Sequence, residues 1–270
     1  MSPLPGWKVL LRAMRGVAPE DHANRLPRLR WWKEVVIVGL LYALYETSRN
    51  ALEGSTKTAF RNALRVIDWQ RQLGINIELD LQRQILDTKW LVHVANYFYG
   101  SLWLVATGAA LIWLYHARPD AYPRWRTTLM VATGIALIGF YVFPLMPPRL
   151  LDSLGDGRSF GFVDTLKEWP PIWAVTADRA QGMSNRFAAM PSMHCGWALW
   201  VSAAVAQRLR NRWLAVLVWA FTPATVWVVA VTGNHYLLDA VGGYLAIGAG
   251  YVVAVLISPS PLPTRERAAS

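Results

Sequence analysis

Long uncharged runs of apolar residues are the feature that most constrains this chain. Residues 91–115 and 127–148 contain no Asp, Glu, Lys or Arg. A helix needs roughly 20 mostly apolar residues to cross the hydrocarbon core of a bilayer. Because lipid offers the backbone no hydrogen-bond partners, such a run crosses a membrane as a helix. The composition agrees, since 16% of the residues are charged, whereas soluble domains carry about 25%.

Six segments are apolar enough to be predicted as membrane-spanning helices, which makes the chain an all-α polytopic membrane protein. The first is the weakest, because it contains Glu46 and Arg49. The predicted spans are residues 34–52, 91–115, 127–148, 190–207, 213–232 and 235–257.

The spans define the expected domain organisation. We expect one six-helix membrane domain over residues 34–258. A basic segment over residues 1–33 precedes it, and a short tail over residues 259–270 follows it.

The basic residues predict the orientation of the spans. They crowd residues 1–33, the connection at residues 118–126 and the turn "RLRNRW" at residues 208–213. By the positive-inside rule these segments face the cytoplasm. Both termini are therefore expected in the cytoplasm, with the protein in the plasma (inner) membrane. The net charge of +10 is interpreted as a topology signal, so that no nucleic-acid partner is expected.

Two loops are consequently predicted on the outer side, over residues 53–90 and 149–190. The first has apolar residues at helical spacing on either side of Gly74, namely Leu64, Ile67, Leu79, Ile85 and Leu86. This pattern predicts one or two amphipathic helices at the outer membrane surface. It fits a lid or packing role, and it equally fits a simple connection between spans.

Polar residues gather at the outer ends of three predicted spans. The third span closes with "FPLMPPRLLD", the fourth opens with "RFAAMPSMHCG", and the sixth opens with "TGNHYLLD". Ionisable groups at membrane depth are costly, so this grouping indicates a functional site. His235 and Asp239 are four residues apart on one helix face. The carboxylate can orient the imidazole and leave its second nitrogen free as a nucleophile, while His194 can supply a proton.

Two further features suit an anionic ligand. Ser192 lies where the fourth helix begins, and free N–H groups at a helix start bind anions. Arg149 offers a fork of donors that matches a phosphate group. Two histidines, an orienting acid and a cationic clamp favour phosphoryl transfer through a phosphohistidine.

The same residues also allow other interpretations. His235 and Asp239 are compatible with a structural helix pair, and Arg149 with an interfacial anchor. Metal ligation by His194, His235 and Asp239 is an alternative as well. We nevertheless expect no metal and no organic cofactor.

These motifs resemble those of the type 2 phosphatidic acid phosphatase superfamily, integral membrane enzymes with a six-helix core. "PSMH" at residues 191–194 is similar to the PSGH motif of that family, and "HYLLD" at residues 235–239 to the HxxxD end of its third motif. The resemblance extends from the second predicted span onward. It implies that His235 is the nucleophile, that Asp239 orients it, and that His194 is the general acid.

The departures from the family pattern indicate a branch. No lysine lies seven residues before Arg149, and the third motif has Val228 and Val229 where the family has Ser and Arg. The chain is closest to the inositol phosphorylceramide synthase-like (inositolphosphotransferase) branch, which it resembles in "FAAMPSMH" and "GNHYLLD". That resemblance implies transfer of a phosphorylated head group, with Arg149 as the main clamp and Arg186 as a replacement cation.

Three functions therefore stay open. A phospholipid or other lipid phosphate is the expected substrate. Water as the acceptor would make the protein a lipid phosphatase, and a hydroxyl group would make it a transferase. The alternative outside the enzymes is a transporter or binder of anionic lipid head groups, which would need the arginines but not the His–Asp pair.

Overall fold

The computed structural model describes residues 30–51, 54–171 and 185–257. All regular elements in these ranges are helices, and one isolated bridge joins Leu145 and Ala188. The predicted all-α class is confirmed. Most of the predicted N-terminal segment and the predicted C-terminal tail lie outside the described residues.

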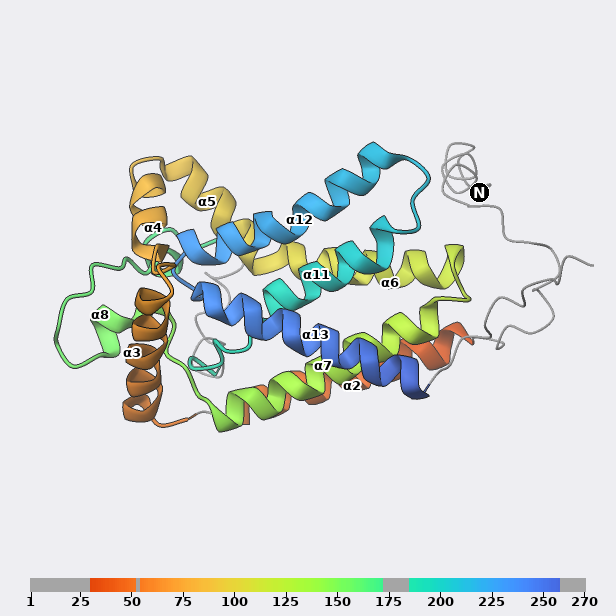
Figure 1. Ribbon diagram of the computed structural model, residues 1–270, viewed down its shortest axis with the longest axis horizontal. Coiled ribbons are helices and arrows are strands. Elements are labelled where there is room, and N and C mark those ends of the chain that lie inside the picture. The colour runs from red at the N-terminus through yellow and green to blue at the C-terminus, as the bar shows by residue number, and fades with distance from the viewer. Residues whose placement is uncertain (1–29, 52–53, 172–184, 258–270) are drawn as a thin grey trace, which may run out of the picture.

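Six helices run along one direction and form a bundle (Figure 1). They are α2 (Trp31–Ala51), α6 (Trp103–Ala117), α7 (Tyr122–Val142), α11 (Met193–Ala206), α12 (Arg212–Val231) and α13 (Leu237–Ile257). Helix α6 continues α5 (Lys89–Tyr97) through the π-helical turn η2 (Phe98–Leu102). At one end of the bundle lie α3 (Thr56–Gln72), α4 (Glu78–Leu86), η3 (Pro148–Leu150), α8 (Leu151–Leu154) and α9 (Thr165–Glu168).

Within the residues that the structure describes, four helical segments are long and apolar enough to cross a membrane, which indicates an integral membrane protein. They are Lys89–Ala117, Tyr122–Val142, Arg212–Val231 and Leu237–Ile257. The other two predicted spans do not reach this standard. Helix α11 is apolar but has 14 residues, a length of about 21 Å, and α2 carries Lys33, Glu34 and Glu46.

The third predicted span ends earlier than expected. Helix α7 stops at Val142, because prolines at positions 144, 147 and 148 cannot continue a helix interior. The chain instead turns across the end of the bundle, where the Leu145 N–H donates to the Phe187 carbonyl at 2.7 Å. The Arg149 N–H then donates to the Gly233 carbonyl at 2.8 Å, which ties this segment to the start of α13.

Helix α11 occupies the centre of the bundle and contacts α6, α7, α12 and α13. Its fully buried Trp200 donates from Nε1 to the Trp125 carbonyl at 2.8 Å. The approach of α11 to α13 is close enough to require glycine, since a Cβ at Gly243 would lie 2.2 Å from the Ser192 carbonyl oxygen. Small residues allow such backbone contact between membrane helices.

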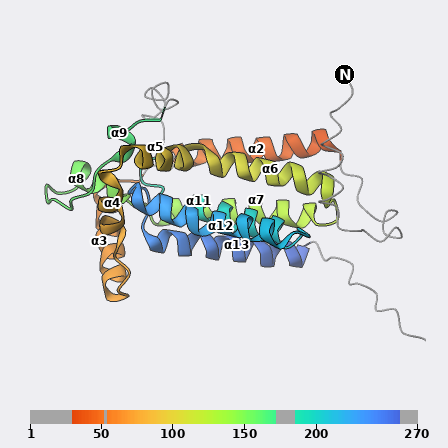
Figure 2. The ribbon, with the colours of Figure 1, turned by 90° about the horizontal axis from the view of Figure 1, so that it is seen from above.

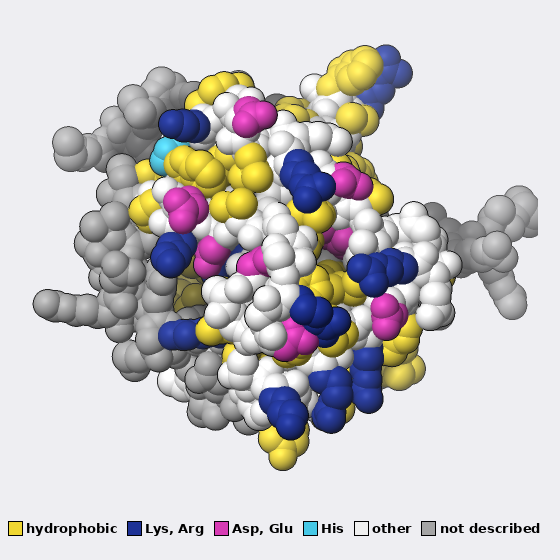
Figure 3. Space-filling view, turned by 90° about the vertical axis from the view of Figure 1, so that its left-hand side faces the viewer, with side chains coloured by type: hydrophobic (Ala, Val, Ile, Leu, Met, Phe, Trp, Pro, Cys, Tyr) yellow, Lys and Arg dark blue, Asp and Glu magenta, His cyan; other side chains and the backbone are white. Residues whose placement is uncertain are grey.

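The two ends of the bundle differ. The arginine-rich connections from α6 to α7 and from α11 to α12 lie on the right in Figure 1, and α3, α4 and α8 lie on the left. Helix α2 lies along the upper side of the bundle in Figure 2 and contacts α7, and its Glu34 forms an ion pair with Arg126 at the start of α7. Figure 3 shows Lys, Arg, Asp and Glu side chains scattered over the left-hand end.

The connection over residues 53–90 contains two helices, in agreement with the one or two that were predicted. Gly74, with φ +69°, lies in the turn between α3 and α4. Helix α3 is part of the core at this end of the molecule: its buried residues Ala59, Ala63 and Val66 belong to one cluster with Leu145 and Tyr236. This loop is therefore packed on the bundle.

Replacement of Gly243 by alanine tests the contact between α11 and α13. Gly243→Ala should lower the stability of the purified protein in detergent by about 1–3 kcal/mol, because overpacking forces backbone shifts. Gly248→Ala on the same helix is the control, since nothing lies within 4 Å of the added methyl group. Thermal unfolding of both variants measures the difference, and equal melting temperatures would contradict the close approach.

Candidate active site

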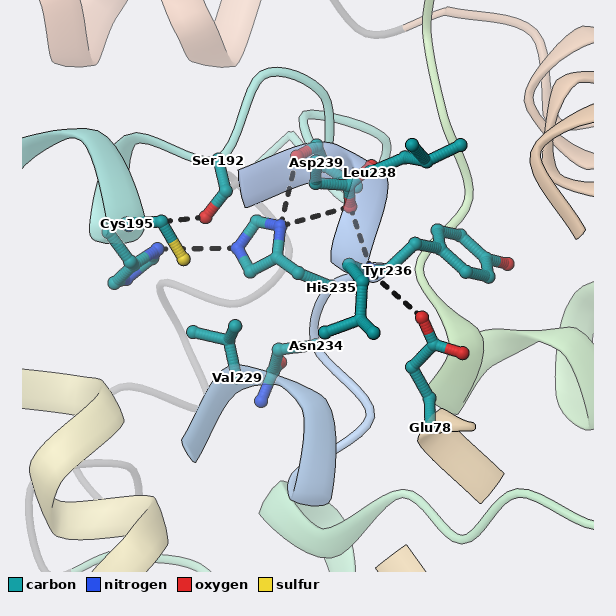
Figure 4. A network of polar contacts seen from close by, with 12 residues as sticks. Glu78, Ser192, Cys195, Val229, Asn234, His235, Tyr236, Leu238 and Asp239 are labelled. Atoms are coloured by element: carbon teal, nitrogen blue, oxygen red, sulfur yellow. Dashed lines mark hydrogen bonds and ion pairs between the residues drawn. The ribbon is translucent and has the colours of Figure 1, made fainter. Parts of the chain in front are cut away.

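Two histidines meet where α11 and α13 begin: His194 lies in the first turn of α11, and His235, labelled in Figure 4, lies two residues before α13. His235 Nδ1 lies 2.9 Å from the Ala189 carbonyl oxygen and 3.3 Å from Asp239 Oδ2. Both partners can only accept, so Nδ1 carries the proton and Nε2 keeps its lone pair. That Nε2 lies 3.3 Å from His194 Nδ1. The structure thus brings His194, His235 and Asp239 together.

Local backbone contacts hold this trio. Ser192 caps α11 by accepting from the Cys195 N–H at 3.4 Å, and its own N–H donates to the Asp239 carbonyl at 2.8 Å. Asp239 Oδ2 also accepts from the Tyr236 N–H at 3.0 Å. His235 is 4% exposed and Asp239 is fully buried. Burial of such polar groups requires these hydrogen bonds, which also restrict how the imidazole can turn.

Aromatic rings enclose His194. The Tyr99 ring stacks on the imidazole with centroids 4.4 Å apart, and the Trp103 ring meets it edge-on at 5.1 Å. Tyr99 lies in the π-helical turn η2, and π-helical turns are frequent at functional sites. Tyr99 falls within the predicted span over residues 91–115, but its stacking on His194 depends on the tertiary arrangement.

Arg149 enters the site from η3. Its Nε donates to Asn234 Oδ1 at 2.8 Å, and one Nη donates to Asp164 Oδ2 at 2.9 Å. A guanidinium group has five N–H donors. Its remaining donors have no hydrogen-bond partner in the part of the chain that the structure describes, so they are available to an anion.

Asp164 is a site residue that sequence reasoning missed. The segment that carries it is held by Asn96, whose Nδ2 donates to the carbonyls of Thr165 and Trp169 at 2.9 Å each. The Thr165 hydroxyl donates to Asn96 Oδ1 at 3.0 Å. No sequence pattern marks this loop, because its position depends on side-chain bonds to a distant helix.

A cavity of about 500 Å³ opens over these groups. His194, His235 and Arg149 line it, and so does Arg186, which is exposed. Ser192 is buried and is not among the lining residues, so its predicted contact with substrate stays a prediction. The other polar lining residues are Tyr45, Tyr99, Asp164, Lys167, Asn185 and Asn234.

The charges of the cavity favour an anionic ligand. Arg149, Lys167 and Arg186 line it together with one carboxylate, Asp164. Val229 stands where the third motif of the similar family has an arginine. Its side chain is 1% exposed and packs with Cys195 in an apolar cluster. Among the described residues, no three His, Cys, Asp or Glu side chains are grouped to hold a metal ion.

Comparison with known proteins identifies the family. No curated protein and no solved structure matches the chain. The sequence model of the PAP2 superfamily matches residues 64–253. This range is well over half of the 270 residues, and it contains both histidines, Asp239 and Arg149. The chain therefore belongs to the PAP2 superfamily.

Proposed function

We propose that this PAP2 protein cleaves or transfers a phosphate-containing lipid head group through a phosphohistidine on His235. Membership of the superfamily indicates a lipid phosphoesterase of the phosphatase type. The finer proposal rests on one observation: Nδ1 of His235 is held between two acceptors while Nε2 points toward His194 at the cavity. A protein that only binds head groups has no need of that arrangement.

The first chemical step follows from these positions. The lone pair of His235 Nε2 attacks phosphorus, and the bond from phosphorus to the leaving oxygen breaks. Substrate displaces the direct contact between the two imidazoles, so that the proton on His194 passes to the leaving oxygen. Asp239 stabilises the positive charge that develops on the His235 ring, because its carboxylate accepts from Nδ1–H.

The second step reverses the roles. An acceptor O–H attacks the phosphorus of the phosphohistidine, His194 takes its proton, and the bond between phosphorus and Nε2 breaks. Water as acceptor releases phosphate, and a lipid or polyol hydroxyl gives a new phosphoester. Resemblance to the inositol phosphorylceramide synthase-like branch supports transfer. Asp164, Asn185 and Asn234 on the cavity wall are suited to bind head-group hydroxyls.

The clamp for the phosphoryl oxygens is Arg149, assisted by Arg186. Arg149 is held by Asn234 and Asp164, so its guanidinium group is preorganised before substrate arrives. Preorganised donors stabilise charge that develops in a transition state, because they do not reorient during the reaction.

We also propose the membrane arrangement of the protein. Helices α2 and α11 complete a six-helix membrane bundle together with the four apolar spans. The arginine-rich end lies in the cytoplasm with both termini, by the positive-inside rule. The cavity then opens on the extracytoplasmic side of the plasma (inner) membrane. No metal or organic cofactor takes part in the proposed steps.

Replacement of the nucleophile tests the mechanism. In detergent micelles with labelled phosphatidic acid as the probe, His235→Ala should lower turnover on the order of 10³-fold or more, because no phosphohistidine can form. His93→Ala on α5 is the control, since His93 is exposed and does not line the cavity. Trapping of acid-labile label on the wild-type protein should fail with His235→Ala, and unchanged turnover would reject the mechanism.

Replacement of the clamp tests the role assigned to Arg149. Arg149→Ala should raise KM about tenfold or more, which corresponds to about 1.4 kcal/mol of lost binding. Arg186→Ala should raise KM less, because Arg186 is exposed. Arg158→Ala removes an exposed arginine paired with Asp156 and serves as the control. An Arg149→Ala variant with wild-type KM would exclude Arg149 from substrate binding.

The choice between hydrolysis and transfer needs a separate measurement. Wild-type protein is given a donor phospholipid with a labelled head-group phosphate, with and without a hydroxyl acceptor such as ceramide or diacylglycerol. A transferase moves the label to the acceptor, because the hydroxyl competes with water for the phosphohistidine. Release of water-soluble label at the same rate in both mixtures would identify a hydrolase and contradict transfer.

A further inference from the structure

Three buried polar side chains distinguish the outer-loop helices α3 and α4 from an ordinary surface connection. Gln70 and Gln82 are fully buried, and Glu78 is 2% exposed. Glutamate and glutamine are seldom fully buried unless hydrogen bonds satisfy them. All three bond to backbone groups of segments that carry the site.

Gln70 and Glu78 cap the first turn of α13. The Leu237 N–H donates to Glu78 Oε1 at 2.8 Å, and the Leu238 N–H donates to Gln70 Oε1 at 3.0 Å. Gln70 Nε2 donates to the same Glu78 oxygen at 2.7 Å. The first N–H groups of a helix lack partners within the helix, so these side chains satisfy them from another part of the chain. Figure 4 shows Glu78 bonded to the start of α13.

This cap lies directly beside the reactive groups. Leu237 is two residues from His235 and two from Asp239. The Tyr236 N–H donates to Asp239. Together with the Leu237 and Leu238 N–H groups, it makes three successive N–H groups that donate to side-chain oxygens. A carboxylate at a helix N-terminus is favoured by the helix dipole. Burial nevertheless raises the pKa of the Glu78 carboxyl group, although the hydrogen bonds from Leu237 and Gln70 act to lower it.

Gln82 supports the other half of the site. Its Nε2 donates to the Val163 carbonyl at 3.0 Å, and its Oε1 accepts from the Val163 N–H at 2.8 Å. Val163 precedes Asp164, which binds Arg149. Gly233 also faces this glutamine: a Cβ there would lie 3.0 Å from Gln82 Nε2, and its φ of +65° is one that glycine adopts readily.

We infer that the helix pair α3–α4 is the positioning scaffold of the site, with two separate arms. Gln70 and Glu78 position the start of α13 and hence His235, whereas Gln82 positions Asp164 and hence Arg149. These are positioning residues, since none of the three lines the cavity. The inference rests on the proposed function, because it assigns the arms to its nucleophile and its clamp.

The two arms predict different kinetic defects. Glu78→Leu leaves two donors without an acceptor and loosens the nucleophile, so kcat should fall about 10²-fold while KM stays within a factor of about three. Glu78→Gln keeps an oxygen for both bonds and should restore most of kcat. Gln82→Leu should raise KM about tenfold and leave kcat within a factor of about three. Asp80→Leu, which removes an exposed carboxylate from the same helix, is the matched control.

The kinetics are measured with phosphatidic acid in micelles, and the affinity for inorganic phosphate by thermal shift. Gln82→Leu should weaken phosphate binding, and Glu78→Leu should not. A merely structural role would change kcat, KM and phosphate affinity together in both variants, and that result would overturn the inference. If Glu78→Leu does not fold, Glu78→Asp replaces it. Its shorter side chain should give a lower kcat than Glu78→Gln, and equal values would overturn the inference.

The controls separate this inference from the proposed function. If the wild-type protein neither turns over phosphatidic acid nor binds phosphate, or if His235→Ala is fully active, the proposed function fails and the inference fails with it. If the wild type is active and His235→Ala is inactive, the proposed function stands. In that case, Glu78→Leu and Gln82→Leu variants with the kinetics of Asp80→Leu would refute the scaffold alone.

Discussion

The close approach of α11 to α13 is the contact on which the rest of the structure depends. A methyl group at Gly243 would meet the Ser192 carbonyl oxygen, and the Ser192 N–H donates to the Asp239 carbonyl. This contact brings His194 from one helix to His235 beside the other. Asp239 is fully buried, and its Oδ2 accepts hydrogen bonds from His235 Nδ1–H and the Tyr236 N–H, whereas its Oδ1 has no partner among the described residues. The bonds that allow its burial are the same bonds that orient the imidazole.

The polar site lies at an end of the bundle for a related reason. Backbone groups that leave a helix need partners, and lipid supplies none. At this end the partners come from segments distant in the chain: Gly233 accepts from Arg149, and Glu78 accepts from Leu237. Helix α3 packs in one cluster with Leu145 and Tyr236, and Ile85 of α4 packs in another with Val228 and Val231 of α12. The connection over residues 53–90 is thus part of the architecture that supports the polar site.

Much of the fold could be predicted from the sequence, because apolar runs and proline positions act locally. Four spans and the two helices within residues 53–90 agree with the prediction. The early end of α7 reflects prolines that were visible in the sequence but were counted within the span. Helix α11 was predicted longer than it is. Its apolar residues begin at the Pro-Ser corner, but the helix starts only where the Ser192 hydroxyl caps it.

The sequence by itself determined the helical class and the charge difference between the two ends, and the spacing of His235 and Asp239 predicted their contact. The expectation that the two share a helix face was wrong, because α13 begins at Leu237 and His235 lies in the non-helical residues before it. Only the tertiary structure decided the rest: the Ala189 carbonyl beside His235, the partnership of Asp164 with Arg149, and the caps from Gln70 and Glu78. These contacts join segments far apart in the chain, and they form because buried polar groups must find partners wherever packing brings them.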